Sequence, residues 1–185
     1  AMLSNTTGHS NVAVGNFALD ANNANQNTAV GYNALTDNTS GAENTALGSG
    51  ALDDNTTGGN NVAVGHAALS ANTTASNNTA LGKAALLLNT TGTENTSIGM
   101  NSLAANTTAS NNTAVGAGSL NANTTGTRNT AVGRHTLLSN TAASDNTAMG
   151  HNALKANTTG VDNAAFGSGA LLANTTSDNN SAFGA

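Results

Sequence analysis

The chain has 185 residues and a net charge of −5, from 9 acidic and 4 basic side chains. Only 7% of the residues are charged and 2% are aromatic, and proline, cysteine and tryptophan are absent. An average domain carries about 25% charged residues, so Asn, Thr and Ser must cover most of this surface. The acidic balance argues against nucleic-acid binding, and the lack of cysteine excludes disulfides and thiolate metal sites. No apolar run approaches the roughly 20 residues of a membrane helix, and we expect no membrane insertion.

A repeat with a period of 17 runs through the whole sequence. Its landmark, Asn-x-Ala-apolar-Gly, begins at residues 11, 27, 44, 61, 78, 95, 112, 129, 146, 163 and 180, so that successive starting numbers differ by 16 once and by 17 thereafter. The unit reads N-T-A-V-G-x-x-A-L-x-x-N-T-T-G-x-x, with ten units from residue 11 to residue 179 and partial units at both ends. We therefore predict a single repeat array over residues 1–185. Because both ends fall inside a unit, we also expect an excised segment of a longer protein.

The columns of the repeat, numbered from the landmark Asn, indicate what each position does. Position 5 is always Gly, which requires either a positive φ or a very close backbone neighbour. Position 3 is Ala except at Ser97, position 4 is a larger apolar residue, and positions 9 and 12 are Leu and Asn in all ten units. Position 15 alternates between Gly and Ala over residues 58–160, so that turn should not require a left-handed residue.

These columns predict an all-β fold. The unit is too short for a two-helix repeat, where known classes need about 33 residues or more, and no helical apolar stripe is present. We expect two short strands per coil, at positions 1–5 and 8–14, stacked as a parallel β-solenoid, or β-roll. Some eleven coils at about 4.8 Å each would form a rod about 50 Å long. Neutral Asn in register can stack as an amide ladder along this rod.

The charged residues identify the corners of the coil and leave one strand without charge. All thirteen fall at positions 6, 10, 11, 16 or 17, which we predict to face solvent: Asp20, Asp37, Glu43, Asp53, Asp54, Lys83, Glu94, Arg128, Arg134, Asp145, Lys155, Asp162 and Asp178. Along N-T-A-V-G, positions 2 and 4 lie on one side of the strand and positions 1, 3 and 5 on the other. A strand without charge on either face is usually buried on both. One thin coil cannot bury both, and we therefore expect a partner chain.

The unit resembles repeats of phage tail-fibre-like proteins and of the heads of trimeric autotransporter adhesins. NTAVGYNALTDNTSGAENTALGSGAL, residues 27–52, is the stretch that carries the resemblance most clearly. The resemblance implies a left-handed, parallel homotrimer that extends or displays an attachment device, on a phage virion or an extracellular bacterial surface. It also implies a receptor or glycan partner, bound through other domains. The leading hypothesis is therefore a structural shaft or adhesin segment that is not an enzyme.

A second hypothesis is ice binding, because a flat face with ranks of Thr can order water. The ranks lie at positions 13 and 14, but adjacent positions alternate sides, so only one rank should face outward. The third hypothesis is a polysaccharide depolymerase. The sequence places no pair of carboxylates where such an enzyme would need them. The position-13 rank runs Thr39, Thr56, Thr73, Thr90, Thr107, Thr124, Thr141, Thr158 and Thr175, and position 14 adds Thr57, Thr74, Thr91, Thr108 and Thr125.

No catalytic, cofactor or metal site is predicted. His66 and His151 share a column but lie five coils apart, about 24 Å at strand spacing, which is too far to share an ion. His9 and His135 are isolated, and Asp53-Asp54 is interpreted as an exposed corner rather than as a calcium site. The Asn-x-Thr triplets are interpreted as ladder residues rather than as glycosylation sites.

Overall fold

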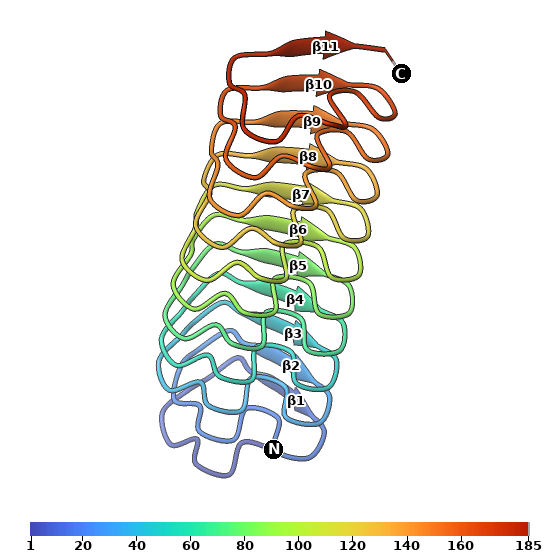
Figure 1. Cartoon of the computed structure of the whole chain (residues 1–185). Helices are drawn as coiled ribbons and strands as arrows, with labels where there is room; N and C mark the ends of the chain where they lie inside the picture. Colours follow the sequence, from blue (N-terminus) through green and yellow to red (C-terminus); the bar gives the residue numbers. More distant parts are fainter. Residues whose placement is uncertain (185) are drawn as a thin grey trace.

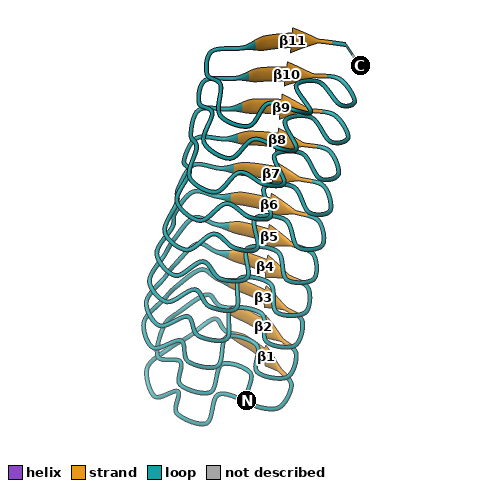
Figure 2. Cartoon of the chain, in the orientation of Figure 1, coloured by secondary structure: helices purple, strands orange, loops and turns teal. Residues whose placement is uncertain are grey.

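The computed structural model describes residues 1–184 as a rod of stacked coils without helices (Figure 1). Eleven three-residue strands form one parallel sheet whose order follows the chain. The sheet runs along one side of the rod, and turns form the remaining sides of each coil (Figure 2). This arrangement confirms the predicted all-β, parallel β-solenoid. The strands are β1 (Val12–Val14), β2 (Thr28–Val30), β3 (Thr45–Leu47), β4 (Val62–Val64), β5 (Thr79–Leu81), β6 (Thr96–Ile98), β7 (Thr113–Val115), β8 (Thr130–Val132), β9 (Thr147–Met149), β10 (Ala164–Phe166) and β11 (Ser181–Phe183).

The strands pair in strict register, so equivalent repeat positions stack on one another. Thr28 pairs with Thr45 and Ala29 with Ala46, and the same step of one repeat continues to β11. The β1–β2 pair is one residue closer in sequence, because Val12 pairs with Thr28. We name each coil after its strand and count it from the landmark Asn, so that the β7 coil is residues 112–128.

The second strand expected at positions 8–14 is not formed. This segment consists of turns, because the position-9 leucines all adopt left-handed φ angles, from 48° at Leu103 to 55° at Leu86. A left-handed residue interrupts the extended geometry of a strand, and positions 7 and 17, on either side of this segment, are left-handed as well. The turns nevertheless bond along the rod: the Leu35 amide donates to the Ala51 carbonyl at 3.0 Å, and the Thr39 amide to the Thr56 carbonyl at 2.9 Å. Coil-to-coil hydrogen bonding therefore extends well beyond the sheet.

The core is a narrow column of small and medium apolar side chains. Positions 3, 8 and 9 point inward, and nine of the leucines at position 9 are fully buried, from Leu19 to Leu154. The invariant glycine at position 5 has both properties that the sequence suggested. Gly82 has a φ of +134°, and a Cβ built on it would lie 2.7 Å from the carbonyl carbon of Gly99 in the next coil. Larger residues are therefore excluded from this column.

Two buried asparagine ladders connect the coils. At position 12, the Asn55 Nδ2 donates to the Asn38 Oδ1 of the previous coil at 2.8 Å and to the Gly58 carbonyl of its own coil at 3.0 Å. At position 1, the Asn44 backbone amide donates to the Asn27 Oδ1 at 2.9 Å. These amides are almost fully buried, and their hydrogen bonds offset the cost of burying them. The predicted amide ladder is confirmed.

The charged side chains occupy the corners. None of the thirteen is buried, in agreement with the corner positions predicted from the sequence. One ion pair joins two corners along the rod: the Arg128 Nε and Asp145 Oδ1 atoms are 2.7 Å apart. Arg128 lowers the pKa of the Asp145 carboxyl through this hydrogen bond, while Asp145 raises the pKa of Arg128. Both side chains are exposed, so the pair contributes little to stability.

Candidate interaction surface

The side chains at positions 2 and 4 of the eleven strands form a continuous, uncharged surface, which we call the outer face. Alternation along each strand places position 3, which is Ala except for Ser97 in β6, toward the core and its two neighbours outward. The larger residues at position 4 remain substantially exposed in this single chain: Leu47 is 46% exposed, Leu81 45% and Met149 43%. An exposed apolar row of this length is unusual on a monomeric soluble protein. The row is Val14, Val30, Leu47, Val64, Leu81, Ile98, Val115, Val132, Met149, Phe166 and Phe183.

The outer face also carries a row of hydroxyl groups at position 2, which sequence reasoning missed. In the described residues 1–184, no hydrogen bond engages these hydroxyls, so they remain available to solvent or to a partner. A period-2 reading of T-x-V could have found the row, because it places Thr beside the aliphatic residue on one face. The row is Thr28, Thr45, Thr79, Thr96, Thr113, Thr130 and Thr147, interrupted by Val62 and Ala164.

The threonine ranks predicted from the sequence, at positions 13 and 14, do not lie on the outer face. Most position-13 hydroxyls form hydrogen bonds within the chain. The position-13 hydroxyls donate to the position-13 carbonyl of the next coil, as in Thr56 to Thr73 at 2.9 Å and Thr90 to Thr107 at 3.0 Å. Position 14 is exposed, as at Thr57. Position 13 is half-buried at Thr56 and Thr90 but exposed at Thr39 and Thr141, so the expectation that only one of the two ranks faces outward stays a prediction. In the described residues 1–184, the outer face carries two rows of outward side chains, the hydroxyls at position 2 and the apolar groups at position 4.

The histidines and paired aspartates do not assemble a site. Among residues 1–184, no three His, Asp or Glu side chains come close enough to hold one metal ion. Asp53 and Asp54 lie at a corner, where Asp53 is half-buried and Asp54 is exposed. Partial burial raises the pKa of the Asp53 carboxyl, and the carboxylates of Asp54 and Asp37 add to this effect.

Comparisons with family models, with curated proteins and with solved structures find no match to this chain. Within residues 1–184 there is no helix of the length and apolarity that a membrane crossing needs. The class of the protein therefore follows from the fold alone: it is a parallel β-solenoid repeat protein.

Proposed function

We propose that this chain is a rigid shaft segment of a trimeric fibre or adhesin, in which the outer faces of three parallel copies pack together. The observation that carries the proposal is the uncharged outer face, with its apolar row along all eleven strands. Burying the remaining half of one aliphatic side chain contributes about 1 kcal/mol to the free energy of association. Every coil repeats this contribution.

A second copy of the same chain is the occupant that fits this face best. The apolar row presents one side chain per coil, with the spacing of neighbouring parallel strands, about 4.8 Å. Only a partner with the same spacing stays in register along the whole rod, and a parallel copy has it by construction. Because charge is confined to the corners, identical outer faces do not repel one another.

Such a rod suits a mechanical role. The hydrogen bonds run from coil to coil along its length, and the core and asparagine ladders continue without interruption. A fibre segment of this kind would be exported or assembled into a virion, and it would hold recognition domains away from the surface that carries them.

Light scattering coupled to size exclusion tests the proposal. We expect a mass of about three times the 17.9 kDa chain. Replacing Leu81 and Val115 by Asp should give a folded monomer, because both residues lie on the outer face. The matched control replaces Thr91 and Thr125 by Asp at the exposed position 14 and should remain trimeric. A monomeric parent chain at micromolar concentration contradicts the proposal.

Ice binding is a second candidate, favoured by one specific observation. The outer face places a row of free Thr hydroxyls beside a row of aliphatic groups on a parallel sheet, with one member of each row per coil. Ordered water could match such an array only if the face is open to solvent. The two functions therefore compete for the same surface.

A further inference from the structure

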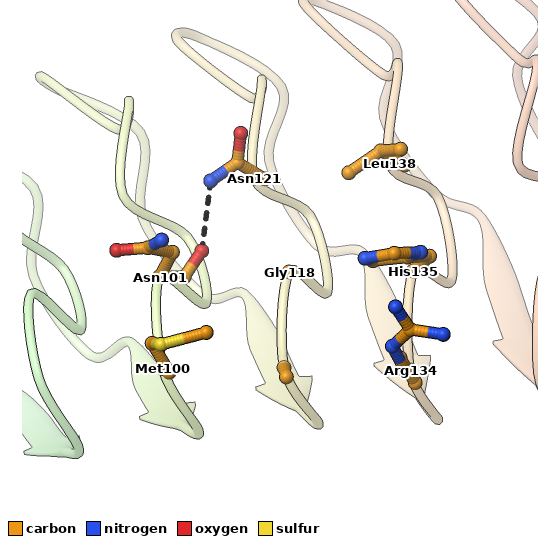
Figure 3. A pocket seen from close by; sticks show the side chains of 8 residues that line it. Met100, Asn101, Gly118, Asn121, Arg134, His135 and Leu138 are labelled. Carbon is orange, nitrogen blue, oxygen red and sulfur yellow. Dashed lines mark hydrogen bonds between the residues drawn. The ribbon is translucent and has the colours of Figure 1, made fainter.

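A hollow of about 250 Å³ opens at one corner of the rod, away from the outer face. It lies over the β6, β7 and β8 coils and is open to solvent. Figure 3 shows its lining side chains arranged around a gap at Gly118. Positions 6, 7 and 10 of successive coils supply the lining: Met100, Asn101, Ala117, Gly118, Asn121, Arg134, His135 and Leu138.

The hollow exists because the middle coil lacks large side chains where its neighbours have them. The β7 coil has Ala117-Gly118, whereas the next coil has Arg134-His135. A Cβ built on Gly118 would lie 2.7 Å from the Cδ2 of His135, so the imidazole ring leans over the gap. Gly50 has the same φ, +66°, in the same column, but nothing lies within 4 Å of its Cβ position.

The three coils under the hollow also depart from the repeat inside the core. Position 8 is Ala in the other seven coils but Ser102, Ser119 and Thr136 in these three. Each buried hydroxyl bonds to a backbone carbonyl: Ser102 to Gly99 at 3.0 Å, Ser119 to Ala131 at 3.0 Å, and Thr136 to Gly150 at 2.6 Å. These bonds tie the corner to the strands beside it, so the walls of the hollow are fixed in advance.

One cationic side chain, Arg134, lines the hollow in an otherwise acidic protein. Lys155 lies on the next coil, outside the lining, and no carboxylate lines the hollow. Among residues 1–184, ion pairing is confined to Arg128 and Asp145, which leaves the exposed Arg134 guanidinium without a carboxylate partner. Partial burial lowers the pKa of His135, and the nearby charges of Arg134 and Lys155 lower it further. Both effects favour the neutral imidazole, which offers one donor and one acceptor.

The remaining lining is suited to a hydroxylated ring. The Asn121 Nδ2 donates to the Asn101 carbonyl at 2.9 Å, which orients the amide and leaves its Oδ1 free to accept (Figure 3). Met100 and Leu138 add apolar surface on opposite sides of the gap (Figure 3). The backbone amides of Gly118 and His135 already donate to the previous coil, so the site has no free edge for a peptide.

We propose that this hollow binds one acidic monosaccharide unit, with the carboxylate on Arg134 and the hydroxyls on the Asn101 and Asn121 amides and the His135 ring. A guanidinium fork matches a carboxylate in two parallel hydrogen bonds. A volume somewhat below the roughly 300 Å³ of the smallest drug-sized pockets fits a single ring. The site is independent of chain association, because its residues lie at corner positions rather than on the outer face.

Ligand-observed NMR titration of the full chain tests this site with D-glucuronate, D-glucose and acetate as probes. We expect saturable, millimolar binding of glucuronate and at least about tenfold weaker binding of the two other probes. Arg134→Gln should weaken glucuronate binding about tenfold or more, and Gly118→Asn should abolish it by filling the hollow. Asn already occupies this column with a similar φ at Asn101, so that variant should fold.

Matched controls come from the same columns elsewhere on the rod. Lys83→Gln removes a cation at position 6, and Gly50→Asn adds the same side chain at position 7; both should bind glucuronate as the parent does. If glucose binds as tightly as glucuronate, Arg134 does not recognise a carboxylate. If acetate binds as tightly as glucuronate, the hollow does not recognise a sugar ring. Undetectable glucuronate binding, or equal loss in the controls, would overturn the site.

Discussion

The Thr73 amide donates to the Thr90 carbonyl at 3.2 Å, whereas the Thr90 amide reaches the Thr107 carbonyl at 2.8 Å. This difference follows the alternation of Ala and Gly at position 15. The equivalent amide-to-carbonyl bond is 3.2–3.4 Å long where the donor's coil contains Ala75, Ala109 or Ala143. It is 2.8–2.9 Å long where the donor's coil has glycine at position 15. A Cβ built on Gly58 would lie only 2.1 Å from the Ala75 carbonyl oxygen. Each alanine therefore separates its coil from the next, and the intervening glycine restores close contact.

The first prediction concerns this alternation. Gly92→Ala would place alanines in three successive coils and spread one corner of the rod while the sheet keeps its spacing. We expect a loss of about 1 kcal/mol in the free energy of unfolding, despite the lower entropy of the unfolded chain. Gly59→Ala is the control, because Ala42 already occupies that column in the preceding coil. Chemical denaturation measures both, and a Gly92→Ala variant as stable as the parent would contradict the account.

The second prediction concerns the left-handed leucines. Leu86 is fully buried with a φ of 55°, a conformation that is poorly tolerated by β-branched side chains. Leu86→Ile keeps the volume but should cost about 1–3 kcal/mol of stability. Val115→Ile, in the extended strand β7, should cost much less. Similar losses in thermal melts of the two variants would show that backbone strain is not the reason for leucine at position 9.

Sequence reasoning could predict the stacking of columns but not the backbone within them. The charge-free columns, the asparagine ladders and the close-packed Gly82 column followed from residue type and period alone. The second strand was predicted wrongly, because Leu at position 9 gives no local signal of a left-handed conformation and tertiary packing decides it. The hollow at Gly118 was also missed, since it depends on side chains of three successive coils, each a full repeat away from the next in the sequence.

The third prediction concerns pH. The raised pKa of Asp53 means that the folded chain holds this proton more tightly than the unfolded chain, so Asp53 opposes folding increasingly as pH rises above its usual value of 3.8. Asp53→Asn should therefore raise the melting temperature at pH 7, and the gain should fade as pH drops below about 3.8. Solvent screening keeps the effect below about 1 kcal/mol. Glu94→Gln, which removes a carboxylate from another exposed corner, is the charge control, and an equal gain there would show that the effect comes from net charge rather than from Asp53.

The last prediction separates the shaft from the ice-binding hypothesis. A trimer buries the outer face, so the Thr hydroxyls of β6 and β8 would be hidden from water, and the purified chain should show no thermal hysteresis and no faceted ice crystals. If the face is instead open and orders water, hysteresis should appear in a monomeric chain. It should then disappear when Thr96 and Thr130 are both replaced by Tyr, because the bulky rings break the row. The control variant Thr91→Tyr with Thr108→Tyr alters only the exposed position-14 rank and should leave such activity intact. Hysteresis that depends on Thr96 and Thr130 in a folded monomer would overturn the shaft proposal, whereas its absence in a trimer would exclude ice binding by the outer face.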